Sequence, residues 1–189
     1  MAVSETGIAN RALQKLGAKR ISALSQDHPN ARSMNAAYVR VRDAELRRYD
    51  WSFAIKRASV AADATDPTWG DWNRYALPND FISLLRDDES GLAVDWKVEG
   101  LFILSMDAAP LEFRYIARIE DPNYFDALFI ESFAARLALE CCKEIADSTS
   151  DKESLKDDYD KCIAEAKRRG AIEKGSQSFP EDDWITARN

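Results

Sequence analysis

The sequence predicts an α+β protein that is mainly α-helical. We expect a helical bundle built from both ends of the chain, with an inserted small antiparallel β module and an extended C-terminal tail. Segments with helical periodicity lie near both ends, whereas alternating apolar and polar residues are confined to the middle. The predicted boundaries place the helical body in 1–54 and 119–174, the β module in 55–118 and the tail in 175–189.

Two amphipathic helices are predicted in the first 50 residues. Ser4 is a typical N-cap for the first helix, and Gly17 is a typical left-handed stop. The second helix follows the start signals Asp27 and Pro29 and covers about residues 30–49. Its arginines lie largely away from its apolar positions: Arg32, Arg40, Arg42, Arg47 and Arg48.

The β module is predicted from alternation and turn signals. Residues 92–98 alternate in polarity and lead through a Glu99-Gly100 turn into residues 101–105, which is the pattern of a β-hairpin. Residues 81–86 form a short strand before it. Residues 111–118 add a third strand whose two faces differ in polarity. We expect one small antiparallel sheet.

Two further helices are predicted after the β module. Asp121-Pro122 is a strong helix start, and residues 125–146 are apolar nearly all round, so this helix belongs in the middle of a bundle. Ser150 and Glu153 form a capping-box pattern that opens the last helix, and Gly170 is its predicted end.

Composition and charge limit the classes of function. With 46% hydrophobic residues in 189, the chain can bury a core without disulfides or metals. The net charge of −7 argues against sequence-nonspecific nucleic-acid binding. Residues 1–60 hold 11 Lys and Arg and 5 Asp and Glu, so positive charge is concentrated at the start of the chain. This asymmetry either joins complementary ends of neighbouring subunits or is solvated surface.

The cysteines and the first residues indicate a cellular setting. Cys141, Cys142 and Cys162 fit neither a disulfide framework nor a zinc spacing, so we expect three reduced core residues. The first residues lack a basic stretch followed by an apolar run, and no segment is long enough to span a bilayer. We expect a soluble protein made in a cytoplasm.

The sequence gives no support for a catalytic site. The single histidine, His28, precedes Pro29 in a turn-rich loop, where a helix cap or a solvent-exposed role is expected rather than a catalytic base. Residues 87–89 are acidic but lack the ligand spacing of an EF-hand. The glycines match neither the P-loop nor the dinucleotide fingerprint. We therefore expect no catalytic, cofactor-binding or metal-binding residue.

Two aromatic segments are candidates for contacts between subunits. Trp69 and Trp72 lie in a turn-rich stretch, where they either pack on the sheet or contact another subunit. The tail carries aromatic residues around the acidic run 181–183, and burial of one Trp and one Phe contributes about 2–3 kcal/mol each. This tail is either disordered or bound to another surface, and we expect it to bind a neighbouring chain. The candidate intersubunit contacts are Phe179, Trp184, Ile185, Trp69, Trp72, Arg47 and Arg48.

Four stretches resemble one known family in the same order. Residues 42–57 (RDAELRRYDWSFAIKR) are similar to the end of the second helix in the tail tubular protein A family, the head-to-tail adaptors of podoviruses. Residues 75–81 (YALPNDF) resemble its Leu-Pro-x-Asp step, and residues 115–122 (YIARIEDP), continuing to Phe129, resemble its entry into the long buried helix. Residues 179–188 (FPEDDWITAR) resemble its acidic, tryptophan-bearing end.

The resemblance implies a structural protein of the virion neck, assembled in the host cytoplasm. It implies a dodecameric ring mounted beneath the portal protein and above a tail nozzle similar to tail tubular protein B. Genomic DNA would pass through the channel without sequence-specific binding, and no membrane would be involved. The family has no catalytic residues to carry over. Residues 63–72 and 87–96 match it least, and the β module they belong to is expected to face the nozzle.

Two other classes of function remain as alternatives. One is a cytoplasmic enzyme with an unrecognised carboxylate or lysine site among residues 87–121, which convergent ionisable groups in a pocket would favour. The other is a DNA-binding accessory protein that uses the arginines of the second helix, which would give salt-sensitive binding to duplex DNA.

Overall fold

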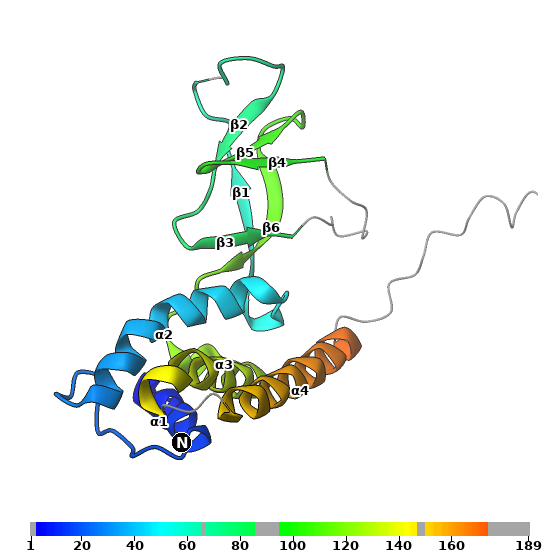
Figure 1. Cartoon of the computed structure of the whole chain (residues 1–189). Coiled ribbons are helices and arrows are strands. Elements are labelled where there is room, and N and C mark those ends of the chain that lie inside the picture. Colours follow the sequence, from blue (N-terminus) through cyan, green and yellow to red (C-terminus); the bar gives the residue numbers. More distant parts are fainter. Residues whose placement is uncertain (1–2, 66, 86–94, 147–149, 174–189) are drawn as a thin grey trace, which may run out of the picture.

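A computed structural model describes residues 3–65, 67–85, 95–146 and 150–173. The fold is α+β and mainly helical, as predicted. The described helices are α1 (Glu5–Lys15), α2 (Pro29–Arg48), α3 (Ala127–Ile145) and α4 (Ser150–Glu173), with short 3-10 turns η1 (Ser52–Ala54) and η2 (Pro122–Tyr124). The described strands are β1 (Ile55–Val60), β2 (Asn73–Ala76), β3 (Phe81–Leu84), β4 (Lys97–Glu99), β5 (Phe102–Ser105) and β6 (Leu111–Ala117). The strands all lie on one side of the helices (Figure 1).

The first two helices begin and end near the predicted positions. Ser4 Oγ accepts a 3.0 Å hydrogen bond from the Gly7 amide, and Gly17 has the expected positive φ of 64°. His28 is the N-cap of α2, because its Nδ1 accepts from the Asn30 amide at 3.2 Å. The predicted capping role of His28 is therefore confirmed.

The start of α3 differs from the prediction. Asp121 caps the 3-10 turn η2, and α3 begins only at Ala127, where Asp126 Oδ1 accepts from the Leu128 amide at 2.8 Å. Phe125, between the two caps, has an extended backbone. This conformation interrupts the helix, and the Phe125 ring packs on the Phe129 ring with 4.9 Å between their centres.

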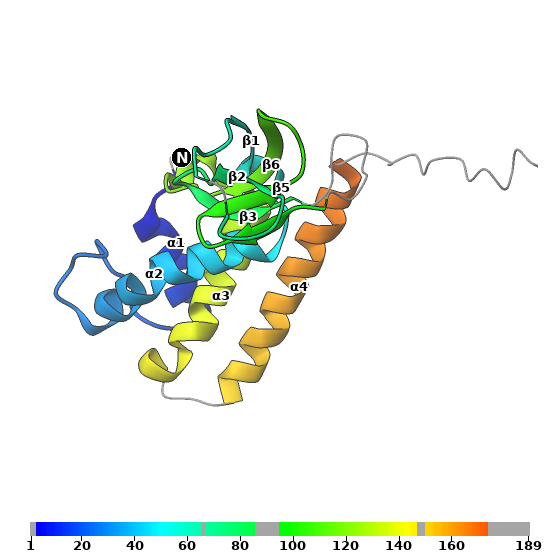
Figure 2. The ribbon, with the colours of Figure 1, turned by 90° about the horizontal axis from the view of Figure 1, so that it is seen from above.

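Helix α3 occupies the centre of the helical bundle, as predicted. It packs against α1, α2 and α4, and it lies between α2 and α4 in the view from above (Figure 2). An aromatic cluster joins it to α2 and to the turn that follows α2. The members of this cluster are Tyr38, Trp51, Phe53, Phe125, Phe129 and Phe133.

The last helix runs past its predicted end. Gly170 lies inside α4, which continues to Glu173. A Cβ atom at Gly170 would lie only 2.5 Å from the Tyr49 hydroxyl, so this glycine permits close packing of α4 against the end of α2. Gly170 therefore serves a packing contact rather than a helix stop.

The described residues of the β module form two three-stranded antiparallel sheets, whereas one sheet was predicted. One sheet has the order β1-β6-β3 and the other β2-β5-β4. The predicted hairpin is present as β4–β5, but β4 covers only Lys97–Glu99, and Asp95 and Trp96 of the predicted strand are not in a strand. The turn is Gly100-Leu101, one residue later than predicted, because Glu99 pairs with Phe102. Residues 86–94 lie outside the described part of the chain.

The third predicted strand, β6, does not extend this hairpin. It pairs with β1 from Ile55↔Ile116 to Val60↔Leu111, and with β3 on its other edge. Strands β1 and β2 were not predicted, because their partners lie far away in the sequence and their own alternation is weak. A second apolar core fills the β module and contains the buried residues Tyr75, Ile103, Leu111, Phe113, Tyr115 and Ala117.

Candidate functional site

A polar network joins the helical body to the β module. Asp43 on α2 accepts a 2.9 Å hydrogen bond from Arg118 Nε, just after β6, and another of 2.9 Å from Arg42 Nε. The Arg42 side chain is 4% exposed, so Asp43 neutralises a buried guanidinium. The network ties α2 to the point where the chain leaves the sheet.

Asp80 is the centre of the same network on the sheet side. Its carboxylate accepts hydrogen bonds from Lys56 Nζ at 2.7 Å and from the Tyr115 hydroxyl at 2.9 Å. Burial by itself would raise the pKa of Asp80, but the hydrogen bonds from Lys56 and Tyr115 hold it below its ordinary value. Burial and the Asp80 carboxylate raise the pKa of Tyr115 to about 12. Asp80 is therefore a charged structural acceptor at neutral pH.

These contacts unite three of the four stretches that carry the family resemblance. Asp43 and Lys56 belong to residues 42–57, Asp80 to residues 75–81, and Tyr115 and Arg118 to residues 115–122. The three stretches are distant in sequence, yet they meet through hydrogen bonds at one place. Nothing in the spacing of the motifs predicted this convergence.

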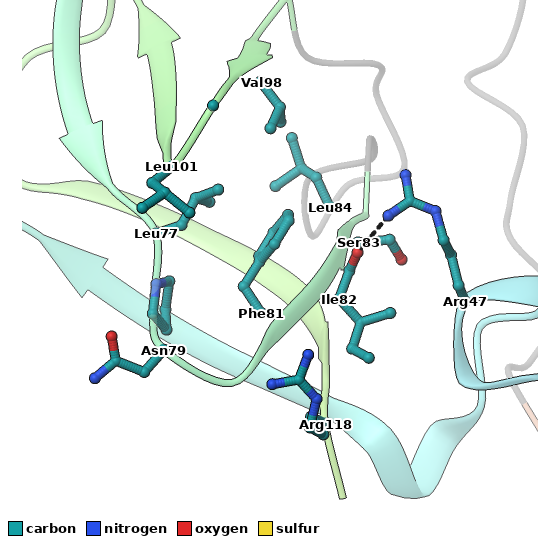
Figure 3. A pocket seen from close by; sticks show the side chains of 12 residues that line it. Arg47, Leu77, Asn79, Phe81, Ile82, Ser83, Leu84, Val98, Leu101 and Arg118 are labelled. Atoms are coloured by element: carbon teal, nitrogen blue, oxygen red, sulfur yellow. Dashed lines mark hydrogen bonds between the residues drawn. The ribbon is translucent and has the colours of Figure 1, made fainter. Parts of the chain in front are cut away.

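A groove of about 660 Å³ opens beside this network (Figure 3). We call it the junction groove, and it lies between the end of α2, strand β3 and the β4–β5 turn. Its lining residues are Arg47, Leu77, Pro78, Asn79, Phe81, Ile82, Ser83, Leu84, Val98, Gly100, Leu101 and Arg118. Arg47 Nη1 donates to the Ile82 carbonyl at 2.7 Å, which fixes Arg47 at one side of the groove. Leu101 is 76% exposed at the opposite side.

The aromatic candidates of the β module divide into one packed and one exposed residue. The Lys97 ammonium lies 4.3 Å from the centre of the Trp72 ring, so Trp72 packs on the β2-β5-β4 sheet. Trp69 is 85% exposed beside it. A pocket of about 260 Å³ lies over this face, where Arg74 also stacks on Phe102 at 4.1 Å. Trp69 remains a predicted contact between subunits.

The arginines of α2 have partners within the chain. Arg32 pairs with Asp27, and Arg40 pairs with Glu140 of α3 at 2.8 Å. The Arg48 guanidinium lies 5.0 Å from the centre of the Tyr159 ring of α4. Arg47 and Arg48 are exposed but already hold α2 against β3 and α4, so a contact with another subunit would come in addition. The candidates Phe179, Trp184 and Ile185 lie outside the described residues.

A buried carboxylate in the bundle was missed by the sequence reasoning. Glu45 is 2% exposed and accepts a 2.8 Å hydrogen bond from the Tyr159 hydroxyl. Burial raises the pKa of Glu45, and Tyr159 together with the charges of Arg48 and Arg136 partly offsets the effect. The burial of Glu45 could have been predicted from its position, because it follows Val41 by one helical turn on the buried face of α2. Its burial indicates a structural rather than a catalytic role.

A shallow pocket bears on the alternative of an enzyme with a carboxylate or lysine site. It has a volume of about 430 Å³, and its ionisable lining residues are Lys56, Asp80, Arg118, Glu120 and Asp121. The Lys56 ammonium and the Asp80 carboxylate pair with each other at 2.7 Å. A carboxylate with a lowered pKa, such as Asp80, is a weak general base at neutral pH.

The cysteines and possible metal ligands can be placed. All three cysteines are free thiols; Cys141 and Cys142 are buried, as predicted, whereas Cys162 is only half-buried. Burial raises the pKa of the Cys141 thiol to about 11, so it is unreactive at neutral pH.

Among the described residues, no group of three His, Cys, Asp or Glu side chains is placed to hold a metal ion. None of the helices in the described ranges is long and apolar enough to cross a membrane.

No protein-family model and no curated protein matches this chain.

Proposed function

We propose that this protein is a structural adaptor of the tail tubular protein A kind, which forms a ring between the portal and the tail nozzle of a short-tailed bacteriophage. The observation that carries the proposal is the polar network at the junction. Residues 42–57, 75–81 and 115–122 are three of the four stretches that resemble the family. The Asp43–Arg118, Lys56–Asp80 and Tyr115–Asp80 hydrogen bonds bring them together.

The two-part architecture suits an adaptor. The buried apolar residues form two clusters: one is centred on the helical body and also includes Ile82, Leu85 and Ile116, and the other lies inside the β module. Each part can therefore present its own surface to a different partner. The polar network fixes the orientation of one part relative to the other. In a closed ring every subunit also uses two different faces for its neighbours. We assign the helical body to the ring wall and the β module to the nozzle side.

Mixing the purified protein with its portal protein tests the proposal. We expect ring-shaped particles in electron micrographs and a large increase in sedimentation coefficient when the portal is added. Genomic DNA would pass through the ring. Because the role is structural, no turnover of a substrate is expected. A protein that stays monomeric with and without the portal would overturn the proposal.

Substitution of Lys56 tests whether the polar network at the junction is needed for ring formation. Lys56→Glu places a negative charge beside Asp80 and should weaken ring formation while the helical circular dichroism signal is retained. Lys56→Arg keeps the positive charge and should assemble normally. Lys19→Glu, at an exposed position outside the junction, is the matched control for the change in net charge.

The ion pairs of α2 weaken the support for the DNA-binding alternative. The arginines of α2 pair with Asp27, Asp43 and Glu140, which lowers the positive charge that they offer to phosphate groups. Salt-sensitive binding of duplex DNA by the full chain, measured by gel shift, would support the alternative instead. The enzyme alternative would be supported by catalytic turnover in the wild-type protein that is lost in the Asp121→Asn variant.

A further inference from the structure

The junction groove combines an apolar wall with two guanidinium groups. The apolar surface of the groove is supplied by Leu77, Phe81, Leu84, Val98 and Leu101. In Figure 3, Leu101 lies at one side of this surface and Ile82 at the other. Arg47 and Arg118 border the same space from the helical side. Such a surface suits a peptide segment that has both apolar and acidic side chains.

The positive charge of this groove comes chiefly from Arg47, whose hydrogen-bond partner is the uncharged Ile82 carbonyl, because Asp43 partly neutralises Arg118. A guanidinium group has five N–H donors. The hydrogen bonds from Arg47 to the Ile82 carbonyl and from Arg118 to Asp43 each use one of these donors and fix the two side chains. The remaining donors suit a carboxylate, because charge-assisted hydrogen bonds to carboxylates are short and strong.

One segment of the chain outside the described residues has the complementary chemistry. Residues 179–185 read Phe-Pro-Glu-Asp-Asp-Trp-Ile, with three consecutive acids between apolar residues. We propose that the junction groove of one copy binds residues 179–185 of a second copy. The role of the second copy rests on the proposed ring, in which a heterologous contact joins two different faces of neighbouring subunits.

The size of the groove agrees with this occupant. A volume of about 660 Å³ lies within the range of about 300–1,000 Å³ that is typical of ligand-binding clefts. Burial of the Phe179 and Trp184 rings would remove about 150–250 Å² of each from water. The acids at 181–183 would then lie close enough to Arg47 and Arg118 to pair with them.

Peptide binding tests the groove without any ring. The probe is a fluorescein-labelled peptide of residues 175–189, and the acceptor is the full chain carrying Phe179→Ala and Trp184→Ala, so that its own tail does not compete. We expect saturable binding by fluorescence anisotropy, weakened about tenfold or more by Leu101→Asp, which adds a repelling charge to the apolar wall. Met106→Asp is the matched control, because Met106 is also exposed in the β module but does not line the groove.

Charge reversal tests the role of the arginines. Arg47→Glu in the acceptor should weaken binding of the natural peptide, and a peptide with lysines at 181–183 should bind this variant better than it binds the unchanged acceptor. Equal affinity of the natural peptide for the unchanged, Leu101→Asp and Arg47→Glu acceptors would overturn the proposal.

A cross-linking experiment identifies the chain that supplies the segment. Trp184→p-benzoylphenylalanine is introduced into ¹⁵N-labelled protein, which is mixed with the unlabelled chain and the portal and then irradiated. We expect cross-links from the ¹⁵N-labelled copy to an unlabelled peptide that contains Leu101. Cross-links found only within the ¹⁵N-labelled copy would overturn the proposal.

Ring formation distinguishes this inference from the proposed function. If wild-type protein forms rings and Leu101→Asp forms them equally well, this inference fails while the adaptor proposal stands. If the peptide binds and the copies cross-link but no ring forms with the portal, the adaptor proposal fails instead.

Discussion

The Tyr159 hydroxyl of α4 donates a 2.8 Å hydrogen bond to the Glu45 carboxylate of α2 inside the helical bundle. Both residues are 2% exposed. Two guanidinium groups lie over the Tyr159 ring: that of Arg48 is 5.0 Å and that of Arg136 is 5.6 Å from the ring centre. The buried carboxylate therefore depends on a hydrogen bond from a helix that is distant in sequence.

Removal of that donor should destabilise the bundle. Tyr159→Phe keeps the ring but leaves a buried carboxylate oxygen without its donor, and we expect the free energy of unfolding to fall by about 1–3 kcal/mol. Urea denaturation followed by circular dichroism measures the change. Tyr124→Phe, at a position that is 69% exposed, should leave the stability unchanged. Equal effects of the two substitutions would contradict the prediction.

Glu45 should make stability depend on pH. Its pKa in the folded protein lies above the ordinary value of 4.5, chiefly because burial disfavours the charged form. Between pH 4.5 and the raised pKa, the folded protein keeps a proton that the unfolded chain releases. The contribution of Glu45 to the free energy of unfolding therefore falls as pH rises through this window and is then constant.

The variant Glu45→Gln isolates this contribution. Its side chain stays neutral, so wild-type protein should lose stability relative to the variant as pH is raised from 4.5 towards neutrality. Urea denaturation at several pH values measures the difference. Glu131→Gln changes a partly exposed carboxylate and is the control. A difference that is independent of pH would show that the folded-state pKa of Glu45 is not raised.

The Asp43–Arg118 pair should show a measurable but small coupling energy. Its side chains are 25% and 37% exposed, so solvent screens the interaction, and we expect about 0.5–1 kcal/mol from a double-mutant cycle with alanine. The cycle also removes the separate cost of leaving the buried Arg42 without Asp43. The control pair is Asp27–Arg32, which is far more exposed and should give almost no coupling. A junction coupling no larger than that of the control would contradict the prediction.

The effect of Gly170→Ala should change sign with Tyr49. Alanine is a better helix former than glycine by about 1 kcal/mol, but here its Cβ would lie 2.5 Å from the Tyr49 hydroxyl. We expect Gly170→Ala to lower the melting temperature of wild-type protein and to raise it in a Tyr49→Ala background. A stabilised single variant would show that the Tyr49 ring moves aside at little cost.

Deletion of residues 175–189 should separate folding from assembly. The described cores contain none of these residues, so the helical signal and the melting temperature should stay close to those of the full chain. Copurification with the portal or with other subunits should be lost. A large fall in the melting temperature of the isolated protein would show that these residues belong to the fold of the single chain.

The helices were predictable because their signals are local. Ser4, His28 and Gly17 act on backbone groups within one turn, and the apolar spacing of residues 125–146 is enough to predict a central helix. The prediction was wrong where a distant contact decides the outcome. Phe125 leaves the helix and packs on Phe53, with 5.9 Å between the ring centres, and Gly170 lies inside α4 where Tyr49 packs against it.

The strands and the junction depended on pairing between distant segments. The β4–β5 hairpin was predictable from its turn, whereas the pairing of β6 with β1 joins residues 50 or more positions apart. In the same way, the sequence contains Asp43, Asp80 and Arg118 as separate charges. Only the fold shows that they form one network.

The sequence by itself determined the fold class, the caps of α1 and α2, and the aromatic, acidic character of residues 179–185, because the fold class follows from periodicity along the chain and a cap follows from hydrogen bonds to residues within one turn. The tertiary structure decided the two sheets, the buried Glu45 and the junction groove, because each requires residues that are distant in the chain to share one space. The free energy of those contacts comes from burial and charge pairing between segments, and neither is encoded in the spacing of any single motif.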